Sequence, residues 1–243
     1  MVDALFAAPR LAALYDPLDP DRRDLDAYLA MAEEFHATSV LDVGCGTGTF
    51  ACALARRGKA VVGVDPAAAS LEVARRKLGA NAVHWVHGDA TALPQLQVDL
   101  ATMTGNVAQV FVDDQDWDVT LASLHTALRP GGRLVFETRH PARQAWRTWT
   151  REDSYRQVDI PGVGVVETWA ELTAVALPLV SFQTTFVFAA DGAVVTSQST
   201  LRFRERDEVV MSLAKAHFGV VDVRDAPDRP DLEMVFVAVK AER

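Results

Sequence analysis

The sequence predicts a doubly wound α/β fold: a seven-stranded, mostly parallel sheet with a helical segment before it and an antiparallel β insertion after its fifth strand. Two observations favour this fold. From residue 39 to residue 138, short β-branched runs alternate with helical patterns, which is typical of βαβ units. After Thr138, β-like runs follow one another without a helix between them, which indicates antiparallel pairing.

Each element of the α/β pattern has its own signal. Apolar residues at helical spacing predict a first helix over residues 24–36, and the turn sequence RPGG stops a helix expected over residues 114–128. Further helices are expected at residues 49–57, 67–78 and 207–217. The strands of the sheet are expected at residues 39–43, 60–65, 82–89, 98–104, 132–138, 219–223 and 232–240.

The insertion has a different pattern. Its three expected strands cover residues 163–169, 179–188 and 194–204, and the sequence ADG at residues 190–192 predicts a tight hairpin turn. We therefore expect a single domain in three parts. These are an N-terminal helical cap at 1–37, a core at 38–138 and 205–243, and an antiparallel lid at 139–204.

Charge and composition disfavour several classes of partner. Acidic residues outnumber basic ones by 33 to 24, and a net charge of -9 repels phosphate backbones, so no nucleic-acid partner is expected. Arg147, Arg151 and Arg156 form a basic run that acidic residues interrupt, which predicts a solvated face.

No apolar run approaches the roughly 18 residues of a membrane span, and the N-terminal sequence lacks the pattern of a secretion signal. Cys45 and Cys52 have no metal-ligand spacing, and we expect a cytoplasmic protein, monomeric or homodimeric.

The stretch SVLDVGCGTGTF places Gly44, Gly46 and Gly48 directly behind an apolar strand. A glycine-rich turn between a strand and a helix offers unpaired backbone amides and room for a ligand. The dinucleotide fingerprint G-x-G-x-x-G does not fit, because the third glycine comes one residue early and Thr49 takes its place. A turn without a ligand is the other alternative, but one glycine would suffice for it.

Acidic residues follow the next two strands. Asp65 lies 21 residues after Gly44, where an acid can accept hydrogen bonds from both ribose hydroxyls; it also suits the start of the following helix. No basic residue follows until Arg75, so a ribose 2′-phosphate would have no partner. Asp89 ends the third strand, where its carboxylate can accept from an exocyclic amino group while the Ala90 amide donates to a ring nitrogen. A plain turn aspartate is the alternative.

In order and spacing, the motifs VLDVGCGTGTF, VVGVD, HGDATALP and LRPGGRLVFE resemble those of the class I S-adenosylmethionine-dependent methyltransferases. The resemblance covers roughly residues 39–138, and the last helix and two strands also fit. It implies a Rossmann-like methyltransferase fold with an antiparallel last strand. It also implies an enzyme that transfers a methyl group from S-adenosylmethionine and releases S-adenosylhomocysteine.

The resemblance also assigns the cofactor-binding residues. The three glycines would bound the methionine moiety, and Asp42 would steady the loop and the ammonium group. Asp65 would hold the ribose, and Asp89 and Ala90 would read the adenine. Tyr15, in LYDPLDP, resembles a tyrosine that several small-molecule methyltransferases fold over the cofactor.

The acceptor is expected beyond the carboxyl ends of the fourth and fifth strands. The fourth ends in MTGNVAQVF, which would place Thr104, Gly105 and Asn106 on the side of the methyl group, with Gln109 one helical turn further. The GN pair resembles that of small-molecule N-methyltransferases such as the glycine and deoxyaminosugar enzymes. For Asn106 the alternative is a left-handed turn residue.

The fifth strand ends in ETRHPARQAWRTW, which brings Glu137, Arg139 and His140 to the edge of the cleft. Asn106 and His140 are the catalytic candidates: His140 could deprotonate an acceptor, or act only as a polar neighbour. A base is not required, since positioning alone can supply about 7–11 kcal/mol. Three tryptophans either line an apolar acceptor pocket or pack the lid; they are Trp146, Trp149 and Trp169.

We therefore expect methylation of a small-molecule acceptor at nitrogen or oxygen, with nitrogen preferred; the lid, which also resembles that of sugar N-methyltransferases, favours a small acceptor. No metal is expected, since Asp113, Asp114 and Asp116 lie at a helix start, where acids suit the helix dipole. Two other functions stay open: a nicotinamide-dependent oxidoreductase, and a cofactor-binding partner protein that has lost catalysis.

Overall fold

The computed structural model describes residues 2–241, which form two β-sheets and the helices around them. The strands of the larger sheet are β1 (Ser39–Val43), β2 (Ala60–Asp65), β3 (Val83–His87), β4 (Val98–Met103), β5 (Leu128–Arg139), β10 (Phe218–Asp225) and β11 (Glu233–Lys240). The strands of the smaller sheet are β6 (Arg156–Ile160), β7 (Gly164–Ala176), β8 (Leu179–Phe188) and β9 (Val194–Arg202). The helices are α1 (Ala4–Ala7), α2 (Pro9–Ala12), α3 (Tyr15–Leu18), α4 (Asp26–Glu34), α5 (Thr49–Arg56), α6 (Ala68–Ala74), α7 (Asp114–Ala127), α8 (Arg151–Ser154) and α9 (Arg206–Lys215).

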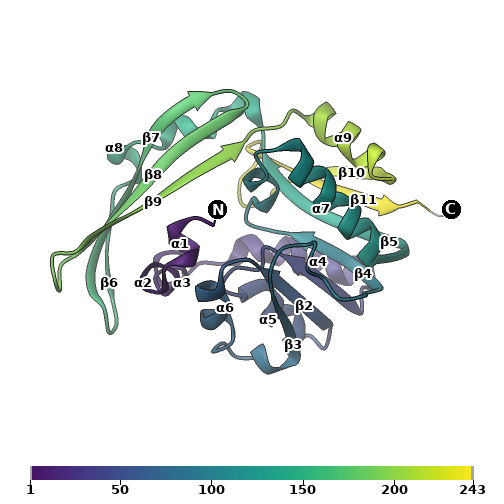
Figure 1. Cartoon of the computed structure of the whole chain (residues 1–243), viewed down its shortest axis with the longest axis horizontal. Coiled ribbons are helices and arrows are strands. Elements are labelled where there is room, and N and C mark those ends of the chain that lie inside the picture. Colours follow the sequence, from purple (N-terminus) through teal and green to yellow (C-terminus); the bar gives the residue numbers. More distant parts are fainter. Residues whose placement is uncertain (1, 242–243) are drawn as a thin grey trace.

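The predicted fold class is confirmed. The larger sheet has the strand order β10-β11-β5-β4-β1-β2-β3, with β1 to β5 parallel and β11 antiparallel to β5. The smaller sheet is antiparallel, in the order β6-β7-β8-β9. Figure 1 shows it as a curved layer set apart from the larger sheet. Because β1, β2 and β4 are parallel neighbours, the segments that follow them meet at one edge of the sheet.

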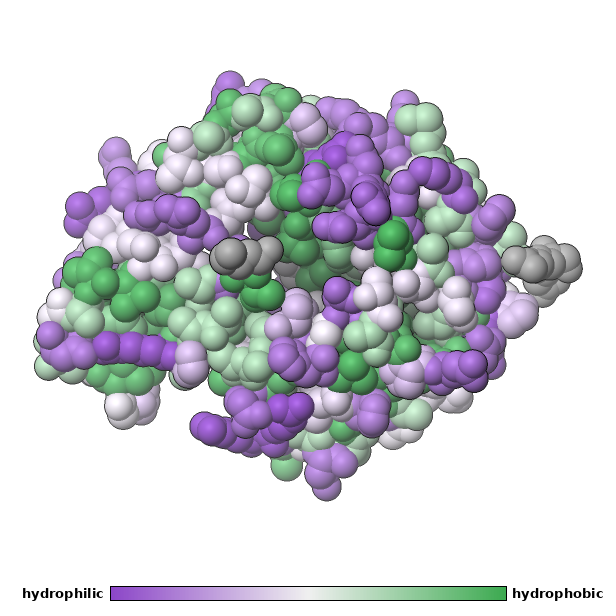
Figure 2. Space-filling model, viewed as in Figure 1, coloured by the Kyte–Doolittle hydropathy of each residue, from purple (hydrophilic) through white to green (hydrophobic). Residues whose placement is uncertain are grey.

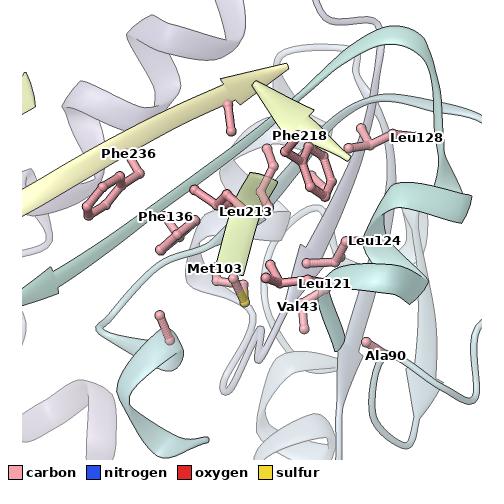
Figure 3. Packing of buried hydrophobic residues seen from close by; sticks show 14 of the residues in the cluster. Val43, Ala90, Met103, Leu121, Leu124, Leu128, Phe136, Leu213, Phe218 and Phe236 are labelled. Atoms are coloured by element: carbon pink, nitrogen blue, oxygen red, sulfur yellow. The ribbon is translucent and has the colours of Figure 1, made fainter. Parts of the chain in front are cut away.

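Helices cover both faces of the larger sheet, since its central strands are apolar on both sides. On one face, Leu121 and Leu124 of α7 and Leu213 of α9 pack around Phe136 and the strands, as Figure 3 shows. The aromatic ring of Phe136 stacks on that of Phe236 with the centroids 5.4 Å apart. On the other face, α4 and α5 bury their apolar sides against the sheet.

The N-terminal helices connect the smaller sheet to the core. Leu11 and Leu14 pack against Phe186 and Phe188 of β8 in one buried cluster. The Ser70 hydroxyl of α6 donates to a carbonyl oxygen of α1 at 3.0 Å. These contacts place α1, α2 and α3 between the smaller sheet and α6 (Figure 1). The face seen in Figure 2 is hollowed near its middle, with hydrophobic residues visible in the depth of the hollow.

Several boundaries differ from the sequence prediction. β8 has the expected limits, but the prediction missed β6, a short polar strand that pairs with β7 across a turn containing Gly162, at φ +80. The helix expected at 67–78 ends at Ala74, because Lys77 N donates to the Ala74 carbonyl oxygen in a tighter turn. β5 begins at Leu128, which pairs with Val98. The pairing then shifts in register, so that Leu100 pairs with Arg133 and the residues RPGG between Leu128 and Arg133 are accommodated by the irregularity. None of the helices described is long and apolar enough to cross a membrane.

Candidate functional site

The glycine loop between β1 and α5 explains why three glycines are needed. All three have positive φ: +69 at Gly44, +53 at Gly46 and +76 at Gly48. A Cβ on Gly44 would lie 2.6 Å from Val107 Cγ2, and one on Gly48 would lie 2.5 Å from the Trp85 ring. A Cβ on Gly46 would meet nothing within 4 Å. Two glycines therefore permit close packing, and the middle one borders open space.

The backbone amides of this loop are mostly paired within the protein. Those of Gly44 and Cys45 donate to the Val64 carbonyl oxygen, at 2.9 and 3.1 Å. The Gly46 amide donates to Asp65 Oδ2 at 2.8 Å, and the amide of the last glycine donates to the Cys45 carbonyl oxygen at 2.8 Å. The expectation of unpaired amides is wrong for these four groups. They do not form the concave set of free donors that binds phosphate.

Asp65 connects the loop to the next helix. Its Oδ1 accepts from the Ala67 amide at 2.7 Å, its Oδ2 accepts from Gly46, and it is only 7% exposed. The helix begins at Ala68, one residue later than expected. Burial raises the pKa of the Asp65 carboxyl, and the two amide donors oppose that rise. Each oxygen keeps a lone pair for a further donor.

Asp42 is a buried carboxylate with an unsatisfied oxygen. Its Oδ1 accepts from the Thr102 hydroxyl at 3.1 Å, while among the described residues its Oδ2 has no hydrogen-bond partner. Burial raises the pKa of Asp42 to about 7, and the carboxylates of Asp65 and Glu137 add to that rise. A cationic or hydrogen-bond-donating ligand group would satisfy this oxygen.

The two segments that follow β3 and β4 differ in exposure. Asp89 is exposed, and its Oδ1 accepts from the Thr91 amide at 2.8 Å and the Thr91 hydroxyl at 2.5 Å, which lowers its pKa. This is the geometry of a turn aspartate, and it leaves Oδ2 for another donor. Ala90 is buried beside it, whereas Thr104 is half-buried and Gly105, at φ +76, is exposed.

Asn106 lies at the centre of a buried polar network. It has φ +61, so the left-handed turn conformation is confirmed. Its main-chain nitrogen donates to Glu137 Oε1, and its side-chain Nδ2 donates to Glu233 Oε1 at 2.9 Å. Its Oδ1 is buried without a partner among the described residues. Burial raises the pKa of Glu137 to about 7, although Tyr28 donates a hydrogen bond to it; Arg229 also donates to Glu233, at 2.8 Å.

The N-terminal segment is fastened to the glycine loop. Asp16 Oδ1 accepts from the Thr47 hydroxyl at 2.7 Å, and its Oδ2 lies 2.6 Å from Lys77 Nζ. These bonds hold Tyr15 close to the loop, and burial raises the pKa of its phenol. The sequence prediction missed Asp16, Lys77, Tyr28 and Glu233, because their partners lie far away along the chain. An acidic residue next to Tyr15 was the one available signal.

Two of the expected acceptor-side residues come together. Gln109 is fully buried, and its Oε1 accepts from Arg139 Nη1 at 2.9 Å. The Arg139 guanidinium lies 5.6 Å from the centre of the Trp149 ring. Arg139 and Trp149 line a cavity of about 420 Å³ whose wall also includes Glu233. The cavity therefore adjoins the Asn106 network.

The other tryptophans lie elsewhere. Trp146 is buried in the segment between β5 and α8, with its ring edge-on to that of Phe203 at 4.6 Å. Trp169 lies beside Tyr155, under the guanidinium of Arg151 at 4.1 Å. Neither Trp146 nor Trp169 lines the cavity. The structure therefore brings only one of the three rings to it.

His140 and the aspartates of α7 complete the predicted set. The main-chain nitrogen of His140 donates to the Leu232 carbonyl oxygen at 2.8 Å, and its Nδ1 is buried without a partner among residues 2–241. Asp113 precedes α7, and Asp114 and Asp116 lie in its first turn, as expected for acids at a helix start. Within that same range, no three His, Cys, Asp or Glu side chains are grouped to hold a metal ion.

Known proteins resemble part of this chain in sequence and nearly all of it in fold. Residues 40–132 match the model of the methyltransferase domain family. A malonyl-[acyl-carrier protein] O-methyltransferase of Serratia marcescens is 30% identical over 156 residues, which are 63% of this chain and 60% of that protein. The chain thus spans about three fifths of the length of that curated relative.

Two solved structures share the fold over nearly the whole chain. A sugar N-methyltransferase from a Streptoalloteichus species has a TM-score of 0.73 and 19% identity, covering 94% of this chain and 93% of its own. An amino pentose methyltransferase of Micromonospora echinaspora, solved with S-adenosylmethionine bound, has a TM-score of 0.69 and 21% identity. It covers 91% of this chain and 93% of its own. At these identities the likeness concerns the fold.

Proposed function

We propose, from the methyltransferase domain at residues 40–132, that this chain transfers a methyl group from S-adenosylmethionine to a small-molecule acceptor, at nitrogen rather than oxygen. The solved relatives include enzymes that act on sugars, and the antiparallel lid favours a small acceptor over a macromolecule. We also place the protein in the cytoplasm, on its cysteine content.

The observation that carries the proposal is the set of hydrogen-bond-accepting oxygen atoms around the glycine loop. Asp42 Oδ2 is buried and unsatisfied, and the space beside Gly46 is open. These features suit the ammonium and the methionine chain of the cofactor, and the lone pairs of Asp65 suit its ribose hydroxyls. Asp89 Oδ2 and the Ala90 amide would meet the adenine. When bound, the cofactor supplies an electrophilic methyl group with a neutral thioether as its leaving group.

The residues of the chain then position the acceptor and exclude water. Tyr15, held close to the loop by the bonds of Asp16, would cover the cofactor. Thr104 and Gly105 would border the methyl group on the other side. Because displacement requires alignment of the nucleophile rather than proton transfer, this positioning can supply most of the acceleration.

Asn106 would orient the nucleophile of the acceptor. Its Nδ2 is held by Glu233, so the unpaired atom is Oδ1, a hydrogen-bond acceptor. Such an oxygen would accept from the N–H of an amine or the O–H of a hydroxyl and leave a lone pair of the nucleophile free to point toward the methyl group. His140, with its unpaired Nδ1, would take up a proton released by the acceptor.

Ligand binding separates this function from a nicotinamide-dependent oxidoreductase. The paired amides of the glycine loop disfavour a pyrophosphate there. We expect S-adenosylhomocysteine to raise the melting temperature and NAD to leave it unchanged. A rise with NAD and none with S-adenosylhomocysteine would overturn the proposal.

Turnover separates the enzyme from an inactive partner protein. The protein is incubated with a metabolite extract and S-adenosylmethionine labelled in its methyl group. We expect label in a small-molecule product, and less of it in an Asn106→Ala variant that still binds S-adenosylhomocysteine. Cofactor binding without transfer to any acceptor would favour the partner protein.

A further inference from the structure

The cavity beside the Asn106 network is lined mainly by positive side chains, although the protein as a whole is negatively charged. Its wall holds four arginines and one glutamate, whereas the whole chain carries a net charge of -9. These residues are Arg139, Arg143, Arg147, Arg229 and Glu233. They come from the end of β5, the segment after it, and the residues that lead into β11. A cleft lined by one sign of charge concentrates ligands of the opposite sign.

Arg139 is the least compensated of these cations. It is half-buried, and its Nη1 donates to the neutral Gln109 at 2.9 Å. Within residues 2–241 no ion pair joins it to a carboxylate, although Glu137 and Glu233 are near enough to act on its charge. Burial and the neighbouring Arg229 guanidinium lower its pKa, although Glu137 and Glu233 oppose that fall. A cation in this position is stabilised when an anion enters the cavity.

The other three arginines differ in how far they are compensated. Arg229 pairs with Glu233 at 2.8 Å and with Asp228 at 3.3 Å. Arg143 lies 3.7 Å from a carboxylate oxygen of Asp231. Arg147 is exposed and, over the part of the chain described, has no ion pair. Among the described residues, the cavity therefore has one guanidinium inside it and another at its rim that form no ion pair.

We propose that this cavity binds a carboxylate or phosphate group of the acceptor, with Arg139 as the main contact and Arg147 as a second one. The inference rests on the proposed function, because it names the class of acceptor. A guanidinium presents paired N–H donors that match both anions. The guanidinium of Arg139 lies 5.6 Å from the centre of the Trp149 ring, which flanks it. Since Glu233 both lines the cavity and holds Asn106, an acceptor anchored there would have its nucleophile close to Asn106.

A second cavity does not share the charge of this one. A cavity of about 690 Å³ lies between residues 90–97 and the C-terminal half of α7, and no charged residue lines it. The four arginines are a local feature of the region where the acceptor is expected.

A binding experiment tests the anion site without an acceptor. The protein is saturated with S-adenosylhomocysteine and titrated with inorganic phosphate, or with acetate, at constant ionic strength, while its melting temperature is followed. We expect a saturable rise at millimolar concentrations.

Arg139→Gln should weaken the phosphate response at least tenfold and Arg147→Gln severalfold. The matched control Arg151→Gln, on an exposed arginine outside the cavity, should match the wild type. A wild-type response that survives in both cavity variants, or no response at all, would overturn the proposal. Because Arg147 is exposed, its variant keeps the test valid even where Arg139→Gln fails to fold.

A second experiment uses turnover. The metabolite extract is divided by anion exchange before incubation with methyl-labelled S-adenosylmethionine. We expect the acceptor in the retained, anionic fraction. Loss of acceptor activity after phosphatase treatment identifies a phosphate, and its persistence identifies a carboxylate. Label found only in neutral or cationic material would contradict the anion site while leaving the methyltransferase proposal intact; no label in any fraction would contradict the methyltransferase proposal.

Discussion

Replacing Gly46 by alanine should weaken cofactor binding far more than it weakens the fold. Gly46 has φ +53, and a Cβ there would meet no protein atom within 4 Å. The substitution therefore adds the cost of a left-handed alanine, about 1–2 kcal/mol, without a clash. It also places a methyl group in the space where we propose the methionine chain of the cofactor.

Gly58 provides a matched control. It follows α5 and has φ +79, and a Cβ on it would also meet nothing within 4 Å, but it lies outside the glycine loop. Both variants should lose about 1–2 kcal/mol of unfolding free energy, or roughly 2–8 °C in melting temperature for a chain of 243 residues. Calorimetry should show the affinity for S-adenosylhomocysteine falling at least tenfold in Gly46→Ala, about 1.4 kcal/mol, and staying within twofold in Gly58→Ala.

Two results would refute this reasoning. Equal cofactor affinity in both variants would mean that no ligand uses the space beside Gly46. A loss of stability in Gly46→Ala much larger than in Gly58→Ala would mean that the space is filled by protein. Gly48→Ala gives the contrast, because its Cβ would lie 2.5 Å from the Trp85 ring and should cost stability by direct overlap.

Three further predictions concern the carboxylates of the site. Asp65→Ala should weaken S-adenosylhomocysteine binding by about 1–3 kcal/mol in calorimetry, and unchanged affinity would refute the role of Asp65 at the ribose. Burial raises the pKa of Asp42 and Glu137 to about 7, so ionisation of these two side chains opposes folding. Their contribution to the free energy of unfolding should therefore fall as the pH rises from about 4 through about 7, and then level off. Urea unfolding at pH 5.5 and 8.5 should show this loss in the wild type and a smaller one in Glu137→Gln; an equal loss in both would count against it. Asp16→Ala removes the bonds to Lys77 and the glycine loop, so hydrogen exchange should quicken in residues 9–18 and not in β1, whereas an Asp21→Ala control on an exposed ion pair should change neither.

The positions of the motifs around the glycine loop could be predicted because their determinants are local. The turn after β1 and the ends of β2 and β3 each carry a short motif, and parallel pairing brings them to one edge of the sheet. The sequence did not reveal that Asp65 pairs with the amide of Gly46, which changes the loop from a set of free donors into a closed turn. That bond depends on loop conformation rather than on residue spacing.

The contacts of Asn106 and of the cavity beside it were harder to predict because they join residues that are distant in sequence. Glu233 meets Asn106 only because β11 lies antiparallel to β5, with Glu233 opposite Arg139. Tyr28 reads as a core residue of an amphipathic helix, and its hydrogen bond to Glu137 depends on how α4 packs on the sheet. The same reason explains the tryptophans: spacing could not tell the ring at the cavity from the two that pack elsewhere.

The buried carboxylates connect ligand binding to stability. Raising a carboxyl pKa from 3.8 to about 7, as burial does for Asp42, corresponds to roughly 4 kcal/mol against the ionised form. Glu137 is buried nearby and adds to the effect. A ligand with a positive charge at this place would favour ionisation and lower both pKa values, and by linkage the ionised site would bind that ligand more tightly. The cofactor should therefore bind more strongly at pH 8 than at pH 6, over the same range in which the ligand-free protein loses stability.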